Sequence, residues 1–169
     1  MDTAFFSLIH FAVIAYALVG GVFLAFSDFI MRSLVLTGGH GGIEAMQTIN
    51  REVFRWVFMA LFLGMAAVSV VVAGYGAFGL SGPAGTLIML SGLVYLIGCF
   101  TVTVVFNVPM NEALAGLEAS VETTRDYWSQ TYVPRWTFWN SVRAFACVAS
   151  AALLLVGLVW MTQNQTQPI

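Results

Sequence analysis

Four long apolar runs, separated by shorter polar segments, make up most of the chain. The runs cover residues 4–27, 54–78, 86–108 and 136–161. A helix needs about 20 apolar residues to cross the hydrocarbon core of a bilayer, and each run is long enough. The pattern predicts an all-α membrane protein, a four-transmembrane-helix bundle in which residues 1–169 form a single domain.

Composition agrees with this class. Hydrophobic residues make up 60% of the chain and charged residues only 8%, whereas an average soluble domain has about 25% charged residues. The net charge of −2 is too small to indicate a polyanionic partner, so the lipid bilayer is the expected partner and nucleic acid is not.

The basic residues are distributed asymmetrically along this pattern. All six are arginines, and they lie in or beside the first and third connecting segments: Arg32, Arg51, Arg55, Arg125, Arg135 and Arg143. Positively charged connections remain in the cytoplasm. The sequence therefore predicts an inner-membrane protein with both termini outside and with residues 38–50 and 110–135 in the cytoplasm.

Both arginine-bearing segments also show helical periodicity. Ile43, Met46 and Val53 recur at helical spacing before the second run, and Leu114, Leu117, Val121 and Trp128 do so after the third. This spacing predicts amphipathic interfacial extensions on the cytoplasmic side.

The first helix carries a series of small residues at intervals of four, Ala17, Gly21 and Ala25. Such a series lets two helices approach closely in a membrane. We therefore expect this face to pack inside the bundle. Asp28 lies on the same face, seven residues beyond Gly21.

Polar and indole side chains gather near the cytoplasmic ends of all four predicted helices. In chain order the set is Asp28, Gln47, Asn50, Asn107, Asn111, Trp136, Trp139, Asn140 and Arg143. The last four share one face of the fourth helix. Their convergence at one level predicts a binding site. The structural alternative is that these amides bond orphan backbone groups or hold neighbouring helices together.

Two charged candidates each have two interpretations. Arg143 lies about 10 Å inward of Trp136 at helical rise, and an arginine at that depth is costly unless it is paired or hydrated. We expect it to pair with Asp28, the only acid within a predicted membrane helix; otherwise it snorkels to headgroups. His40, in the glycine-rich segment 37–42, either reaches over the site or remains solvated.

Motifs for metals and common cofactors are missing. The chain has no HExxH, CxxC or CxxCH motif and no pair of intramembrane histidines suited to haem. We therefore expect no metal and no cofactor. Cys99 and Cys147 fall inside predicted helices at similar depth and are expected to be free, structural thiols rather than a redox pair.

Four segments together resemble a known family. They are GGVFLAFSDFIM (20–31), MQTINR (46–51), NVPMN (107–111) and WTFWNSVR (136–143). In this order they resemble the anthrone oxygenase-like family, whose bacterial members were long catalogued as membrane proteins of unknown function. The resemblance implies a four-helix membrane protein. Fungal members of the family convert an anthrone to an anthraquinone with dioxygen.

The resemblance also implies roles for the predicted site. The reaction needs a base, donors for a developing oxyanion and a water-excluding pocket. Asp28 is the expected base, with His40 as its substitute, and Arg143, Asn107 and Asn140 are the expected donors. Trp136 and Trp139 would stack on a small hydrophobic aromatic substrate, and Gln47, Asn50 and Asn111 complete the predicted substrate-binding set.

Two other function classes compete with a cofactor-independent oxygenase. The apolar faces also suit a non-catalytic subunit of a homo-oligomer or of a larger membrane complex. A transporter has less support, because four helices without an internal repeat do not match the usual architecture. A well-formed cavity between the cytoplasmic helix ends would favour the enzyme.

Overall fold

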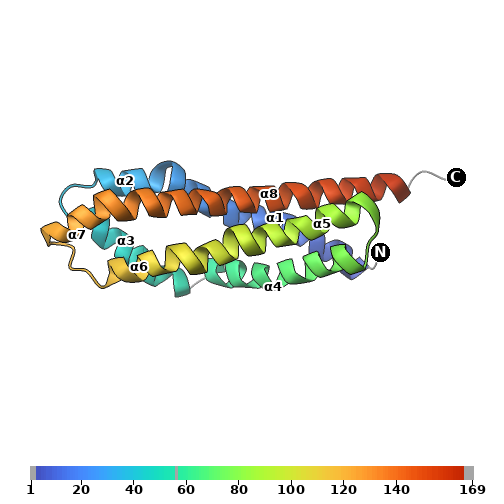
Figure 1. The fold of residues 1–169 in the computed structure, drawn as a ribbon, viewed down its shortest axis with the longest axis horizontal. Helices are drawn as coiled ribbons and strands as arrows, with labels where there is room; N and C mark the ends of the chain where they lie inside the picture. Colours follow the sequence, from blue (N-terminus) through green and yellow to red (C-terminus); the bar gives the residue numbers. More distant parts are fainter. Residues whose placement is uncertain (1–2, 56, 166–169) are drawn as a thin grey trace.

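The computed structural model describes residues 3–55 and 57–165, which are helical apart from short turns (Figure 1). Four helical spans are long and apolar enough to cross a membrane: Thr3–Leu36, Val57–Phe78, Gly82–Ala115 and Glu122–Gln163. The predicted four-helix membrane bundle is confirmed. Trp56, which the second apolar run includes, lies outside the described residues.

Three of the four spans combine several helical segments. The first consists of α1 (Thr3–Ala25), a π-helical turn η1 (Phe26–Ile30) and α2 (Met31–Leu36). The third consists of α5 (Gly82–Tyr95), the π-helical turns η3 (Leu96–Thr101) and η4 (Thr103–Asn107), and α6 (Val108–Ala115). The fourth consists of α7 (Glu122–Tyr127), a π-helical turn η5 (Trp128–Tyr132) and α8 (Val133–Gln165) as far as Gln163.

The second span is the shortest. It is α4 (Val57–Phe78), preceded by a separate helix α3 (Gly41–Glu52) and a 3₁₀ turn η2 (Val53–Arg55). The α2–α3 turn and the α4–α5 turn each contain a glycine with positive φ, Gly39 at +66° and Gly82 at +75°. This conformation costs glycine little. Pro83 follows Gly82 in the first turn of α5, where its missing N–H is not needed.

Figure 1 shows the bundle as an elongated body with two distinct ends. One end is formed by α2, α3, α6 and α7, and we call it the α3 end. The α4–α5 turn lies at the other end, where α1 begins and α8 finishes, and we call it the α4–α5 end. Along the bundle α1 packs on α8, α8 on α5, and α5 on α4, whereas α1 and α4 contact each other much less.

The predicted packing face of the first helix is wrong. Ala17 and Gly21 are exposed, and a Cβ at Gly21 would have no atom of the described residues within 4 Å. The buried face instead contains Tyr16, Gly20 and Phe23, and a Cβ at Gly20 would lie 2.9 Å from the Cys147 Cβ. Lipid and bundle interior are equally apolar, so small residues alone do not determine which face of a helix is buried.

The predicted extensions form a second core at the α3 end. This α3-end cluster consists of Met31, Ile43, Met46, Leu114, Ala119, Trp128, Tyr132 and Trp136. Leu117 and Val121 are exposed because α6 ends at Ala115 and α7 begins only at Glu122. The expected periodic helix after the third run is therefore two helices separated by a turn.

Candidate functional site

A cavity of about 310 Å³ lies between the α3-end cluster and the rest of the bundle. This volume is at the lower end of the usual range for small-molecule sites, about 300–1,000 Å³. Its walls are mostly apolar and aromatic, with rings from Phe23, Phe26, Phe54, Phe58, Phe62, Phe100 and Trp136. The polar residues that line it are Asn50, Thr103, Asn111, Asn140 and Arg143.

Arg143 is the only charged residue among those lining residues, and only 5% of it is exposed. Its Nη2 donates a hydrogen bond to Asn140 Oδ1 (2.7 Å), and its Nη1 donates to Thr103 Oγ1 (3.3 Å). The guanidinium carbon lies 4.2 Å from the centroid of the Phe23 ring and 5.4 Å from that of Trp136. Its buried Nε–H has no hydrogen-bond partner among the described residues.

The expected ion pair between Asp28 and Arg143 does not form. Asp28 lies in the π-helical turn η1 and is exposed. The ion pairs found among residues 3–55 and 57–165 are His40–Glu44 and Arg55–Glu52, and both lie on the surface. The positive charge of Arg143 is therefore surrounded by neutral groups, an arrangement that is costly in a membrane and typical of functional sites.

Asn140 holds Arg143 in place and joins two helices. Its Nδ2 donates hydrogen bonds to the Phe23 carbonyl oxygen and to Ser27 Oγ, both at 2.6 Å. Its Oδ1 accepts the hydrogen bond from Arg143. Because both ends of the amide are satisfied, the side chain fixes the guanidinium relative to α1 as well as to α8.

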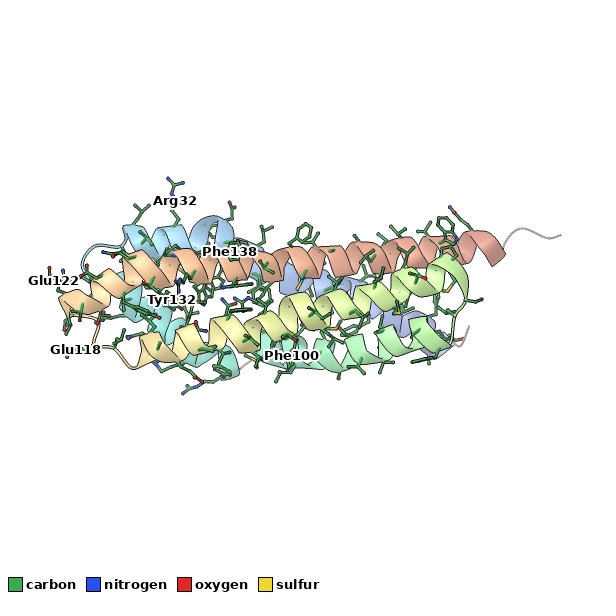
Figure 2. All side chains as sticks on the ribbon, in the orientation of Figure 1. Arg32, Phe100, Glu118, Glu122, Tyr132 and Phe138 are labelled. Carbon is green, nitrogen blue, oxygen red and sulfur yellow. The ribbon has the colours of Figure 1, made fainter. Side chains whose placement is uncertain are left out.

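A second polar network lies on the α3 side of the cavity. Asn111 Oδ1 accepts hydrogen bonds from Trp136 Nε1 and from the Tyr132 hydroxyl, both at 2.8 Å. Asn50 Nδ2 donates to the same hydroxyl at 3.3 Å. Figure 2 shows Tyr132 inside the bundle, whereas Arg32 projects from α2 away from it. The network holds the Trp136 indole, which is 4% exposed, against the cavity.

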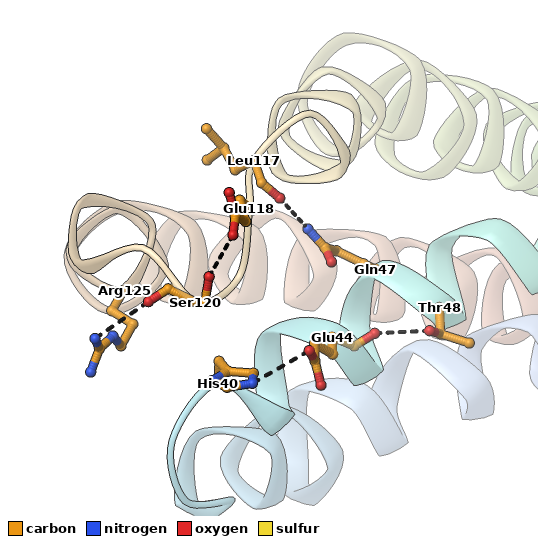
Figure 3. Close-up of polar contacts among 8 residues, drawn as sticks. All are labelled: His40, Glu44, Gln47, Thr48, Leu117, Glu118, Ser120 and Arg125. Atoms are coloured by element: carbon orange, nitrogen blue, oxygen red, sulfur yellow. Dashed lines mark hydrogen bonds and ion pairs between the residues drawn. The ribbon is translucent and has the colours of Figure 1, made fainter.

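Asn107 and Gln47 have structural contacts. Asn107 is fully buried and donates from Nδ2 to the Trp136 carbonyl oxygen at 3.3 Å, although it does not line the cavity. Gln47 Nε2 donates to the carbonyl oxygen of Leu114 (2.8 Å) in α6. It also donates to that of Leu117 (2.9 Å), just beyond α6 (Figure 3). Gln47 thus fulfils the structural alternative, satisfying backbone carbonyls at a helix end.

Two further candidates lie away from the cavity. His40 is exposed and contacts Glu44 at 3.5 Å on the surface of α3 (Figure 3). Trp139 is half-buried and stacks on Phe106 with a centroid distance of 3.7 Å. Neither residue lines the cavity.

The structure therefore brings together Asn50, Asn111, Trp136, Asn140 and Arg143 of the predicted set. Sequence reasoning missed Thr103 and Tyr132 as parts of the site. Both carried a usable signal, because Thr103 lies four residues before Asn107 and Tyr132 four residues before Trp136. Such spacing places each beside a predicted site residue on the same helix face.

Cys99 and Cys147, predicted to lie at similar depth, are neighbours in the hydrophobic core of the bundle. Both are buried and free, and their sulfur atoms lie 3.4 Å apart. Within the described part of the chain, no group of three histidine, cysteine or acidic side chains is placed to hold a metal ion.

The fold and the cavity define a class: an integral membrane four-helix protein that encloses an aromatic pocket around one buried guanidinium. A family model described as anthrone oxygenase matches residues 51–153, and the chain belongs to this family. The match includes the segments 107–111 and 136–143, while 20–31 lies outside it. No curated protein and no solved structure matches the chain.

Proposed function

We propose that the protein is an oxygenase-like enzyme that binds a lipophilic phenolic or polycyclic carbon acid as its anion. The observation that carries the proposal is the Arg143 guanidinium, which is buried at the cavity and has no carboxylate partner among residues 3–55 and 57–165. An anion in the cavity would supply the missing negative charge. The surrounding rings suit a flat aromatic skeleton, and the cavity is the feature that favours an enzyme over an accessory subunit.

An anthrone-type substrate gives this site a complete reaction. Loss of a proton from its CH₂ carbon gives an enolate whose oxygen accepts hydrogen bonds from Arg143. The enolate carbon donates its electron pair to dioxygen, a C–O bond forms, and the peroxide takes up a proton. Loss of the second C–H proton with cleavage of the O–O bond then leaves a carbonyl and water. Dioxygen is the only co-reactant in this scheme.

Arg143 acts in this scheme by stabilising the enolate, the charged species that forms before oxygen reacts. Water is the proposed proton acceptor, because Asp28 and His40 are exposed and the residues lining the cavity include no carboxylate and no imidazole. Asn140 and Thr103 are positioning residues, since they hold the guanidinium.

The proposal includes an orientation in the inner membrane. The arginine-rich α3 end would face the cytoplasm, and the α4–α5 end would face outward. The positive charge of the first and third connections supports this assignment.

Turnover of 1,8-dihydroxyanthrone in lipid nanodiscs tests the proposed reaction. Oxygen uptake and quinone formation should exceed autoxidation with the native protein. Removing one donor to an oxyanion costs about 100-fold or more in rate, so Arg143→Gln should reduce the enzymatic rate by about that factor. Arg135→Gln is the matched control, because Arg135 is exposed and does not line the cavity. Equal rates for Arg143→Gln and the native protein would refute the role of Arg143.

A further inference from the structure

The line along which α1 and α4 face each other, which we call the α1–α4 seam, is closed by side-chain contacts at the α4–α5 end of the bundle. Near the α4–α5 end the Phe5 and Tyr75 rings stack with centroids 3.6 Å apart. Further along, a hydrogen bond of 2.7 Å joins the Tyr16 hydroxyl to Ser69 Oγ. From there the two helices diverge: α1 and α2 continue alongside α8, whereas α4 begins on the opposite side of the bundle (Figure 1).

The cavity occupies the part of the seam where the helices have separated. Val22 on α1 and Leu63 on α4 both line the cavity, and 39% and 51% of their surfaces are exposed. Here the two helices meet through aromatic rings, since Phe23 contacts Phe58 and Phe62 at centroid distances of 5.7 and 6.4 Å. The Phe23 ring also covers the Arg143 guanidinium at 4.2 Å.

The seam on the other side of α4 is much tighter. A Cβ at Gly92 of α5 would collide with the Ser69 carbonyl oxygen of α4, and one at Gly76 of α4 would collide with the Met89 backbone nitrogen of α5. The Tyr95 hydroxyl donates a hydrogen bond of 3.0 Å to the Phe62 carbonyl oxygen. Backbone contact and a buried hydrogen bond thus hold α4 to the third span, whereas the contacts described between α1 and α4 beside the cavity are those of the Phe23 ring with Phe58 and Phe62.

We infer that the cavity is filled from the bilayer, through the α1–α4 seam, between Val22 and Leu63. The ligand class rests on the proposed function: a neutral aromatic acid dissolves in the hydrocarbon, passes the Phe23 ring and becomes an anion beside Arg143. The exposed apolar residues of the seam lie within spans that are long and apolar enough to cross a membrane. A lipophilic molecule therefore reaches the cavity without leaving the apolar phase.

Labelling of a cysteine inside the cavity tests the route without any turnover. Met59 lines the cavity and is half-buried, so Met59→Cys places a thiol there. In nanodiscs, lipid-soluble N-(1-pyrenyl)maleimide should label this thiol, whereas the charged reagent 2-sulfonatoethyl methanethiosulfonate should react at least tenfold more slowly. Peptide mass spectrometry locates the label at position 59 and separates it from Cys99 and Cys147.

Narrowing the seam should slow labelling by the lipid-soluble reagent. We expect Val22→Trp and Leu63→Trp each to reduce the labelling rate of Met59→Cys at least tenfold. Leu24→Trp and Val70→Trp are the matched controls, because both positions are exposed on the same helices and do not line the cavity. These controls should leave the rate unchanged within a factor of two.

Three results would overturn the inference. The first is an unchanged labelling rate of Met59→Cys in both Val22→Trp and Leu63→Trp. The second is a labelling rate with the charged reagent equal to that with the lipid-soluble reagent, and the third is no labelling of Met59→Cys at all. Slowing by Val104→Trp but not by Leu63→Trp would also overturn it, because Val104 is an exposed lining residue of the third span. Failure of the proposed reaction would appear as absent quinone formation with the labelling pattern intact.

Discussion

Arg143 is held by neutral acceptors on two different helices. Asn140 Oδ1 and Thr103 Oγ1 fix two of its nitrogens, and Nε has no hydrogen-bond partner within the part of the chain that the structure describes. Of the four residues whose spacing predicted a shared face of the fourth helix, Trp136, Asn140 and Arg143 line the cavity, whereas Trp139 does not. The spacing within the fourth helix could not show that Asp28 does not pair with Arg143, because Asp28 belongs to the first span and its direction depends on how that span is rotated.

Replacing Arg143 by lysine distinguishes the contribution of the positive charge to the reaction rate from that of the guanidinium geometry. Lysine keeps the positive charge but lacks the planar fork that holds an acceptor and an anion together. We expect Arg143→Lys to slow quinone formation by about tenfold, equivalent to losing one hydrogen bond to a charged group at about 1.5 kcal/mol. Its melting temperature in detergent should remain closer to the native value than that of Arg143→Gln. A native rate in Arg143→Lys would mean that charge alone is sufficient.

At the scale of the element, the rotation of α1 about its axis determines which residues reach the site. The buried Tyr16 and Phe23 side chains fix this rotation, so Gly20 faces Cys147 while Gly21 and Asp28 face outward. The sequence offered small residues on both faces and gave no hydropathy difference between lipid and bundle. The wrong packing face of the first helix and the wrong partner predicted for Asp28 therefore have the same cause: the sequence did not determine the rotation of α1 about its axis.

A pair of adjacent glycines tests this rotation. Gly20→Leu should lower the melting temperature of the detergent-solubilised protein, because even its Cβ would lie 2.9 Å from the Cys147 Cβ. Overpacking of this kind costs about 1–3 kcal/mol. Gly21→Leu should change the melting temperature little, because its Cβ would meet no atom within 4 Å in residues 3–55 and 57–165. The reverse order of the two effects would mean that α1 is rotated.

At the scale of the whole molecule, the apolar runs predicted the number and order of the spans but not their length. The first and third spans contain 34 residues each, or about 51 Å at 1.5 Å per residue. A hydrocarbon core is only about 30 Å thick. A substantial part of each span therefore extends beyond the hydrocarbon core. The polar residues of these extensions interrupt the hydropathy pattern, although the helices continue.

The proposed orientation is tested by cysteine accessibility in intact cells. Thr3 and Thr37 are both exposed, and they lie at opposite ends of the first span. A membrane-impermeant maleimide added outside should label Thr3→Cys and should label Thr37→Cys only after the cells are opened. External labelling of Thr37→Cys alone would reverse the assignment of the two faces.

The π-helical turns contribute residues to the wall of the cavity. Each holds one more residue than the α-turn it replaces, and Phe26, Phe100 and Thr103 of the cavity wall belong to these turns. Deleting one residue from such a turn would return the helix to regular α-helical spacing and rotate the residues beyond it about the helix axis. The pocket therefore depends on the spacing of residues as well as on their identity, a component that substitution scanning leaves unseen and that single-residue deletions would reveal.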